Sequence, residues 1–136
     1  MPRPEVTIDD VQTIGVLIVD DKPTFRAVAR TVVGLAPGFE VVAEAETGEG
    51  AVEAATAAGP GLVLMDINLP GINGIEATRR ITEARPGTVV ILMSTYDADA
   101  LPADADSCGA ADYVHKEDLS PAVLRRVCDQ RPPGPG

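Results

Sequence analysis

Four short apolar runs in this chain each end in a polar residue, and this pattern constrains the fold more than any other feature. The residues that close the runs are Asp20 with Asp21, then Asp66, then Ser94, then Lys116. Short apolar runs separated by helical stretches are typical of parallel strands that are buried on both faces. In open α/β sheets the carboxyl ends of the strands line the binding site. We therefore expect three carboxylates, a hydroxyl and a lysine to converge at one edge of a sheet.

The spacing of apolar and turn-forming residues predicts alternating strands and helices. Strands are expected at 14–19, 39–45, 62–66, 88–93 and 111–115, and helices at 48–58, 74–85 and 119–129. A further helix follows Pro23 and is stopped by Pro37 and Gly38. Its apolar residues at helical spacing predict an inner face made of Phe25, Val28, Ala29, Val32 and Val33. The alternation predicts an α/β fold, with a parallel sheet layered between helices.

One stretch does not fit this alternation well. Residues 97–106 carry four acids and almost no apolar face, although a helix is expected between the last two strands. Pro102 would cost about 3 kcal/mol in a helix interior. We expect a short or frayed helix there.

Length and charge narrow the class of protein. At 136 residues the chain is expected to form one domain at 14–129, with a polar leader at 1–13 and a Pro/Gly-rich tail or linker at 130–136. The net charge of −10 argues against direct nucleic-acid binding, which needs clustered Lys and Arg. No run approaches the ~20 apolar residues of a membrane span, so we expect a soluble, cytoplasmic protein. Cys108 and Cys128 form no metal-like pair and are expected to stay reduced.

The residues at the strand ends suit phosphoryl transfer to a carboxylate. A carboxylate can attack phosphorus, but its charge repels the phosphoryl oxygens. A hard divalent cation, Mg²⁺ or Mn²⁺, removes that repulsion and binds carboxylate and carbonyl oxygens. Asp20, Asp21 and Asp66 provide such oxygens, and the backbone carbonyl of Asn68 is a further candidate ligand. Lys116 and the hydroxyl of Ser94 can contact the phosphoryl oxygens. Taken singly, each of these residues also has an ordinary structural explanation, as a helix cap, a strand end or a surface lysine.

The same residues lie in four sequence pieces that resemble the receiver domain of bacterial two-component response regulators. The pieces are residues 16–21, 64–74, 93–95 and 109–116, in the order and at the spacing usual for that family. The resemblance covers about 14–129. It implies a flavodoxin-like, doubly wound five-stranded parallel sheet in strand order 2-1-3-4-5, with helices on both faces. Residues 74–81 resemble receivers that are usually joined to a C-terminal helix-turn-helix.

This resemblance implies roles for the acids. Asp66 corresponds to the phosphoacceptor of the family. Asp20 and Asp21 correspond to its metal-binding acids, and Asn68 contributes its main-chain oxygen to the same ion.

The resemblance also implies a set of residues that respond to the phosphoryl group. Ser94, followed by Thr95, corresponds to the hydroxyl switch, and Lys116 corresponds to the family's lysine. Tyr113 corresponds to the aromatic residue whose rotamer couples to that hydroxyl. The family often has a cis Lys-Pro bond at the lysine, whereas Glu117 follows Lys116 in this chain. A cis bond at a non-proline residue costs about 2.5–4 kcal/mol.

We therefore expect a phosphorylation-dependent switch rather than an enzyme, with at most self-phosphorylation from small donors and self-dephosphorylation. The expected partners are a sensor histidine kinase and either an unknown output protein or a C-terminal DNA-binding domain. Dimerisation stays open. The output is expected to be a protein–protein contact.

Three other functions compete with this interpretation. A phosphorylation-independent pseudo-receiver would act as a binding module, but it would be expected to lack one of the acids or the lysine. An aspartate-dependent phosphatase would need a second acid two residues after the nucleophile, where Asn68 stands. A flavin-binding electron carrier is disfavoured by an aromatic content of 3%.

Overall fold

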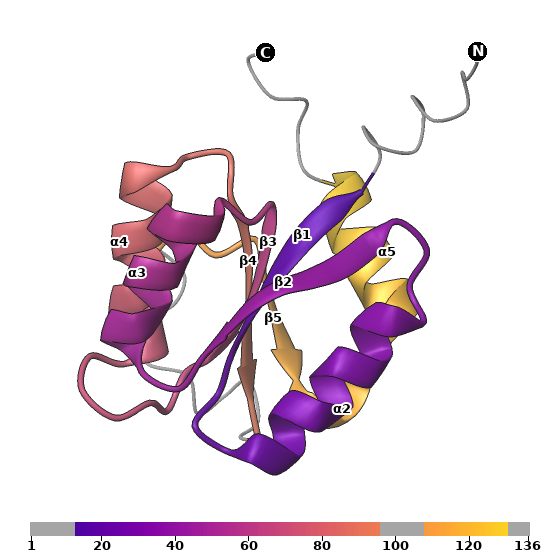
Figure 1. The fold of residues 1–136 in the computed structure, drawn as a ribbon, viewed down its shortest axis with the longest axis horizontal. Helices are drawn as coiled ribbons and strands as arrows, with labels where there is room; N and C mark the ends of the chain where they lie inside the picture. Colours follow the sequence, from indigo (N-terminus) through magenta and orange to yellow (C-terminus); the bar gives the residue numbers. More distant parts are fainter. Residues whose placement is uncertain (1–12, 96–107, 131–136) are drawn as a thin grey trace.

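The computed structural model describes residues 13–95 and 108–130, which form one parallel sheet with helices on both faces (Figure 1). The sheet has five strands in the order β2-β1-β3-β4-β5, and each neighbouring pair is parallel. The strands are β1 (Ile14–Val19), β2 (Phe39–Ala45), β3 (Leu62–Asp66), β4 (Val89–Ser94) and β5 (Asp112–His115). The flavodoxin-like fold and the strand order implied by the resemblance to receiver domains are confirmed.

Three helices connect the first four strands, and a fourth follows the last strand. They are α2 (Pro23–Gly34), α3 (Gly48–Ala58), α4 (Gly74–Ala84) and α5 (Pro121–Gln130), with a short 3₁₀ helix η3 (Lys116–Asp118) after β5. The predicted acidic stretch at 97–106 lies outside the described residues, as do nearly all of the predicted leader and tail.

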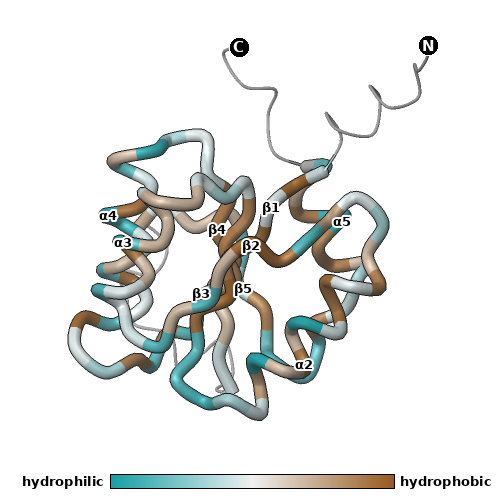
Figure 2. The backbone as a smooth tube through the Cα atoms, viewed as in Figure 1, coloured by the Kyte–Doolittle hydropathy of each residue, from teal (hydrophilic) through white to brown (hydrophobic). Residues whose placement is uncertain are grey.

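Two apolar cores lie on the two sides of the sheet. In Figure 1, α2 and α5 cover one face and α3 and α4 cover the other. Alternate residues of β3 serve the two cores: Leu62 and Leu64 pack toward α2 and α5, whereas Val63 and Met65 pack toward α3 and α4. The central strands are largely brown in Figure 2, because most of their residues are apolar, and every residue of β3 and β4 is buried. This double burial explains why the strands are continuous apolar runs and not alternating patterns.

Side-chain caps and glycines set the helix ends. The Thr47 side chain accepts a hydrogen bond from the Gly50 N–H and starts α3, and Asn73 caps α4 through the Glu76 N–H. Gly59, at φ 58°, ends α3 in the left-handed conformation that glycine adopts without strain.

Two sequence predictions need correction. Val28 was predicted on the inner face of α2, but it is 51% exposed, because it lies to the side of the stripe formed by Ala29, Val32 and Val33. The last helix begins at Pro121 and not at residue 119. Proline is well suited to the first helical position, and it disfavours the helical conformation of the preceding residue.

Among the described residues, no helix combines the length and the apolar character that a membrane crossing requires.

Candidate functional site

The strand order brings the predicted site residues to one edge of the sheet. Asp20 and Asp21 follow β1, Asp66 ends β3, Ser94 ends β4 and Lys116 follows β5. These four strands are neighbours in the sheet and point the same way; the arrowheads of β4 and β5 mark this edge in Figure 1. Carboxylate oxygens of the three aspartates lie within 4.8 Å of one another. The convergence predicted from the sequence is therefore present.

The acids differ in their exposure to solvent. Asp20 is fully buried and Asp66 is 2% exposed, whereas Asp21 is exposed. Burial raises the pKa of Asp66, because desolvation disfavours the ionised carboxylate. The Lys116 ammonium opposes this pKa shift, and the neighbouring Asp20 carboxylate reinforces it. Asp66 is thus a buried carboxyl whose charge depends on the cations beside it.

Lys116 supplies positive charge at the centre of this cluster. Its Nζ lies 2.6 Å from Asp20 Oδ2 and 3.5 Å from Asp66 Oδ2, and its side chain is only 10% exposed. The same Nζ lies over the ring of Phe25, 4.6 Å from the ring centroid. Lys116 is therefore enclosed by two carboxylates and an aromatic face. No cis peptide bond occurs in the described ranges, which include the bond between Lys116 and Glu117.

Backbone hydrogen bonds orient the two buried acids. Asp20 Oδ1 accepts the Lys22 N–H at 2.8 Å, and Asp66 Oδ1 accepts the Asn68 N–H at 3.2 Å. Each carboxylate therefore accepts a hydrogen bond from the amide two residues further on, as in an Asx-turn. The guanidinium of Arg26 donates to the backbone carbonyl of Asp20 at 2.7 Å and holds this turn from α2.

The loop after Asp66 is tied to two helices. The Gly74 N–H donates to the carbonyl of Ile67 at 2.8 Å, where α4 begins. Glu49, in the first turn of α3, accepts the Ile72 N–H at 3.2 Å. Asn68 lies in this loop and is exposed. The backbone that carries the predicted carbonyl ligand is thus anchored at its far end.

The predicted switch residues occupy different environments. Ser94 is buried and Thr95 is exposed, so of the two residues only Ser94 belongs to the buried end of β4. Tyr113 is half-buried against the core on the α4 side. The imidazole of His115 joins β5 to the residue after β4: its Nδ1 accepts the Glu117 N–H, and its Nε2 lies 3.0 Å from the Thr95 carbonyl oxygen.

The donor set fits a divalent cation. Two lysine ammoniums lie beside the three carboxylates, Lys116 at Asp20 and Asp66 and the exposed Lys22 at Asp21, so negative charge is in excess. Two of the three carboxylates are buried, and buried carboxylates require cationic partners. Mg²⁺ is bound through one or two carboxylates together with other oxygen ligands, and this site offers such oxygens.

Sequence reasoning missed three neighbours of the site. Phe25 was assigned only to the apolar face of α2, although its position four residues after Asp21 could have placed it near the strand ends. Arg26 and Glu49 were not singled out, because the groups that they contact at the site are backbone groups of turns that the sequence does not position. Arg26 also forms an ion pair with Glu44, at 3.3 Å.

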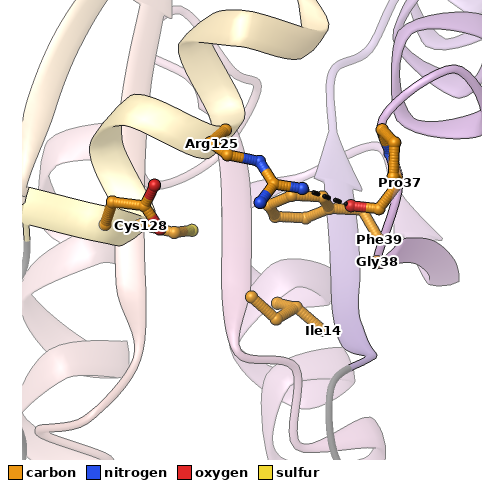
Figure 3. Close-up of a pocket in the computed structure, with 7 residues that line it drawn as sticks. Ile14, Pro37, Gly38, Phe39, Arg125 and Cys128 are labelled. Atoms are coloured by element: carbon orange, nitrogen blue, oxygen red, sulfur yellow. Dashed lines mark hydrogen bonds between the residues drawn. The ribbon is translucent and has the colours of Figure 1, made fainter. Parts of the chain in front are cut away.

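A cavity lies at the opposite edge of the sheet and takes no part in this cluster. It measures about 340 Å³ and is lined by the start of β1, the turn before β2 and the last turns of α5. Figure 3 shows Arg125 reaching across it to donate to the carbonyl of Pro37, at 2.8 Å, beside Ile14, Phe39 and Cys128.

Comparison with known proteins shows the family. The sequence profile described as "Response regulator receiver domain" matches residues 16–127. The chain is 37% identical over 114 residues to the transcriptional regulatory protein DegU of Brevibacillus brevis, covering 84% of this chain and 48% of that protein. The chain spans about half the length of the curated relatives that it matches.

Solved structures agree with this assignment. The signal receiver domain of the putative response regulator NarL from Mycobacterium tuberculosis superimposes with a TM-score of 0.77 at 30% identity, covering 88% of this chain and 99% of that one. A LuxR-family two-component response regulator from Aurantimonas sp. SI85-9A1 gives a TM-score of 0.77 at 31% identity, covering 90% of this chain and 91% of the other. The chain belongs to the receiver domain family of two-component response regulators.

Proposed function

We propose that Asp66 accepts a phosphoryl group from a phosphohistidine of a sensor histidine kinase, and that this step switches a protein-interaction surface. The observation that carries the proposal is the enclosure of Asp66: a nearly buried carboxylate lies next to Lys116 and within one cluster with Asp20 and Asp21. A buried carboxylate beside other acids lowers the stability of the fold, and such residues cluster at functional sites.

The reaction transfers a phosphoryl group from a histidine nitrogen of the kinase to a carboxylate oxygen of Asp66. An Asp66 carboxylate oxygen attacks the phosphorus, the bond between phosphorus and the histidine nitrogen breaks, and the electron pair of that bond stays on the imidazole, which takes up a proton. Asp66 becomes an acyl phosphate. The Lys116 ammonium, 3.5 Å from Asp66 Oδ2, is placed to contact a phosphoryl oxygen, and the Ser94 hydroxyl is the candidate for a second contact.

Mg²⁺ or Mn²⁺ would be held by Asp20, Asp21 and Asp66, with the main-chain oxygen of Asn68 as a further ligand. When bound, the cation supplies charge neutralisation between the carboxylate and the phosphoryl oxygens. Two hydrogen bonds hold the segments that carry these ligands: Arg26 fixes the turn that carries Asp20, and Glu49 fixes the loop that carries Asn68.

After transfer, roughly −1.5 to −2 units of charge replace one carboxylate at the end of the central strand. Ser94 and Lys116 respond to that charge; Thr95 follows Ser94 just after β4, and Tyr113 lies on β5, just before Lys116. The contact between His115 and the Thr95 carbonyl joins these strands, so a movement of one affects the other. We propose that the altered surface lies around β4 and β5.

The proposed switch acts on an output partner. The relatives include regulators named as transcriptional and solved proteins of the LuxR family. The output partner of this domain is therefore either a C-terminal DNA-binding domain or a separate protein, and a homodimer is one form that the phosphorylated protein could take. The proposed location is the cytoplasm.

Intact-mass spectrometry after incubation with Mg²⁺ and a small acyl phosphate tests the central step. We expect a gain of one phosphoryl group in the wild type and none in Asp66→Asn or with a chelator present. Mg²⁺ binding without any gain, even with a cognate kinase, would instead support a pseudo-receiver that binds partners without phosphorylation.

A further inference from the structure

Both carboxylate partners of Lys116 have a second role in the proposed function. Its Nζ makes a 2.6 Å contact to Asp20, which is a proposed metal ligand, and a 3.5 Å contact to Asp66, which is the proposed phosphoacceptor. Both carboxylates have another role in the switch, so neither offers the lysine a partner of constant charge. A lysine side chain also has four rotatable bonds, so its own geometry does not fix the position of the ammonium group.

The ring of Phe25 is the third neighbour of Lys116. Nζ lies over the ring at 4.6 Å from its centroid, within the ~6 Å range of a cation–π contact. Such contacts are stronger where the cation is removed from water, and the Lys116 side chain is 10% exposed. The ring carries no titratable group and binds no metal, so its attraction for the ammonium is the same whatever happens at the acids.

The ring is also held in place by the first turn of α2 and by the core. Phe25 lies in the first turn of α2, where its N–H donates to the Lys22 carbonyl at 3.1 Å, and its side chain packs against the core under α2 and α5. The next residue, Arg26, ties the same turn to the Asp20 carbonyl. A fixed aromatic face therefore stands beside a long, flexible cation.

We propose that Phe25 is a positioning residue for Lys116: its ring keeps the ammonium beside Asp66 while Asp20 and Asp66 change partners. This inference rests on the proposed function, because it assigns Lys116 to the phosphoryl group. A lysine whose ammonium is already in place stabilises the transition state without losing further side-chain entropy during the reaction.

The contact itself is tested by NMR without any phosphorylation. The sequence has two lysines, Lys22 and Lys116, so a protein labelled with ¹³C at the lysine ε-carbons gives two signals, assigned with Lys22→Arg. Lys22 is an internal control, since its side chain is 65% exposed and lies beside Asp21. We expect the Lys116 ε-protons to be shifted upfield by the ring, to stay shifted when Mg²⁺ is added, and to lose the shift in Phe25→Leu. Loss of the shift on adding Mg²⁺ would overturn the proposal.

The effect of the Phe25 ring on the rate of phosphorylation is tested by lowering the electron density of the ring. The sequence has two phenylalanines, Phe25 and Phe39, so fluorinated phenylalanine incorporated into a Phe39→Leu protein labels residue 25 alone. Fluorine weakens the attraction of the ring face for a cation and leaves the shape of the ring nearly unchanged. We expect the rate of phosphorylation by an acyl phosphate to fall stepwise with fluorine number, by about threefold overall, and Mg²⁺ affinity to stay the same.

The matched control is Phe25→Leu with fluorinated Phe39, in which added fluorine should leave the rate unchanged. If fluorination of Phe25 has no effect although Phe25→Leu slows phosphorylation, the ring acts only through packing and the inference is wrong. A wild type that takes up no phosphoryl group from any donor overturns the proposed function, and the NMR experiment then decides the contact between Phe25 and Lys116 by itself.

Discussion

Gly74 lies directly against the backbone of Asp66: a β-carbon at residue 74 would overlap the Asp66 carbonyl oxygen and crowd the α-carbon of Ile67. Gly74 is the first residue of α4, and its N–H donates to the Ile67 carbonyl at 2.8 Å. The helix that follows the proposed phosphoacceptor therefore starts at van der Waals contact with the strand end that carries it. The spacing between Asp66 and α4 depends on the absence of a side chain.

We expect Gly74→Ala to destabilise the protein by about 1–3 kcal/mol, the usual cost of overpacking, because the atoms in the way belong to the backbone and cannot rotate aside. Chemical denaturation measures the change in unfolding free energy. Gly34→Ala is the matched control, since a β-carbon at residue 34 has no atom within 4 Å, and it should be neutral or slightly stabilising. Equal stability of the two variants would contradict the packing argument.

The raised pKa of Asp66 predicts a pH-dependent gain in stability on its removal. The folded chain binds the Asp66 proton more tightly than the unfolded chain does, whose carboxyl has the ordinary value near 3.8. Asp66 therefore lowers stability above its raised pKa, and this penalty disappears as the pH falls through that value toward the ordinary one. With divalent cations chelated, we expect Asp66→Asn to unfold at higher temperature than the wild type at pH 7, by a margin that shrinks on acidification.

The control for that experiment is Glu53→Gln, which removes an exposed carboxyl from α3. Its melting temperature should follow the wild type across the same pH range. A margin for Asp66→Asn that grows on acidification would mean that the pKa of Asp66 is lowered in the fold.

Glu49 is expected to control the opening of the loop after Asp66. Its Oε2 accepts the Ile72 N–H, so Glu49→Ala removes the acceptor, and Glu49→Gln keeps an oxygen in its place. We expect amide hydrogen exchange at Ile72 to be about tenfold faster in Glu49→Ala and near the wild-type rate in Glu49→Gln. Glu53→Ala, one turn along the same helix, should leave this amide unchanged. Unaltered exchange in Glu49→Ala would show that Gly74 holds the loop without help.

Mg²⁺ is expected to stabilise the folded protein by mass action. At a concentration 100 times its dissociation constant, a cation bound only by the folded state adds about 2.7 kcal/mol to the unfolding free energy. We expect a rise in melting temperature for the wild type and a smaller rise for Asp21→Asn, measured by calorimetry. Asp129→Asn removes an exposed acid at the other edge of the sheet and should respond to Mg²⁺ as the wild type does. An equal response of all three proteins would place the ion elsewhere.

The alternation of strands and helices and the meeting of the acids could be predicted because one physical constraint controls both, whereas the strand order was implied by the resemblance to receiver domains. A strand buried on both faces must be apolar throughout, so its end is visible in the sequence as the first polar residue, as at Asp66 and Asp20. Parallel strands bring those ends to one edge. The predicted strands therefore agree with β1, β2 and β3 at both ends and with β4 and β5 to within one residue.

The rest of the site depends on contacts that have no such signature. Phe25 and Lys116 are paired because α2, packed on β1 and β2, begins at the edge of the sheet where β5 ends, and the apolar spacing of α2 shows only that the ring faces inward. At the site, Arg26 and Glu49 bind backbone groups, which every residue possesses, so nothing in the sequence marks these partners. For the same reason Val28 was placed inside: helical spacing defines a stripe but not its width.

The pairing of Asp20 with Lys116 joins residues 96 positions apart in the sequence. As the chain leaves the ribosome, Asp20, Asp21 and Asp66 are all available well before the lysine has been synthesised. An incomplete domain would hold Asp20 and Asp66 without the ammonium that contacts both, so it would lack the group proposed to contact the phosphoryl oxygens. The proposed transfer to Asp66 would then become possible only when the fifth strand pairs with the fourth, so phosphorylation would require that synthesis and folding of the domain are complete.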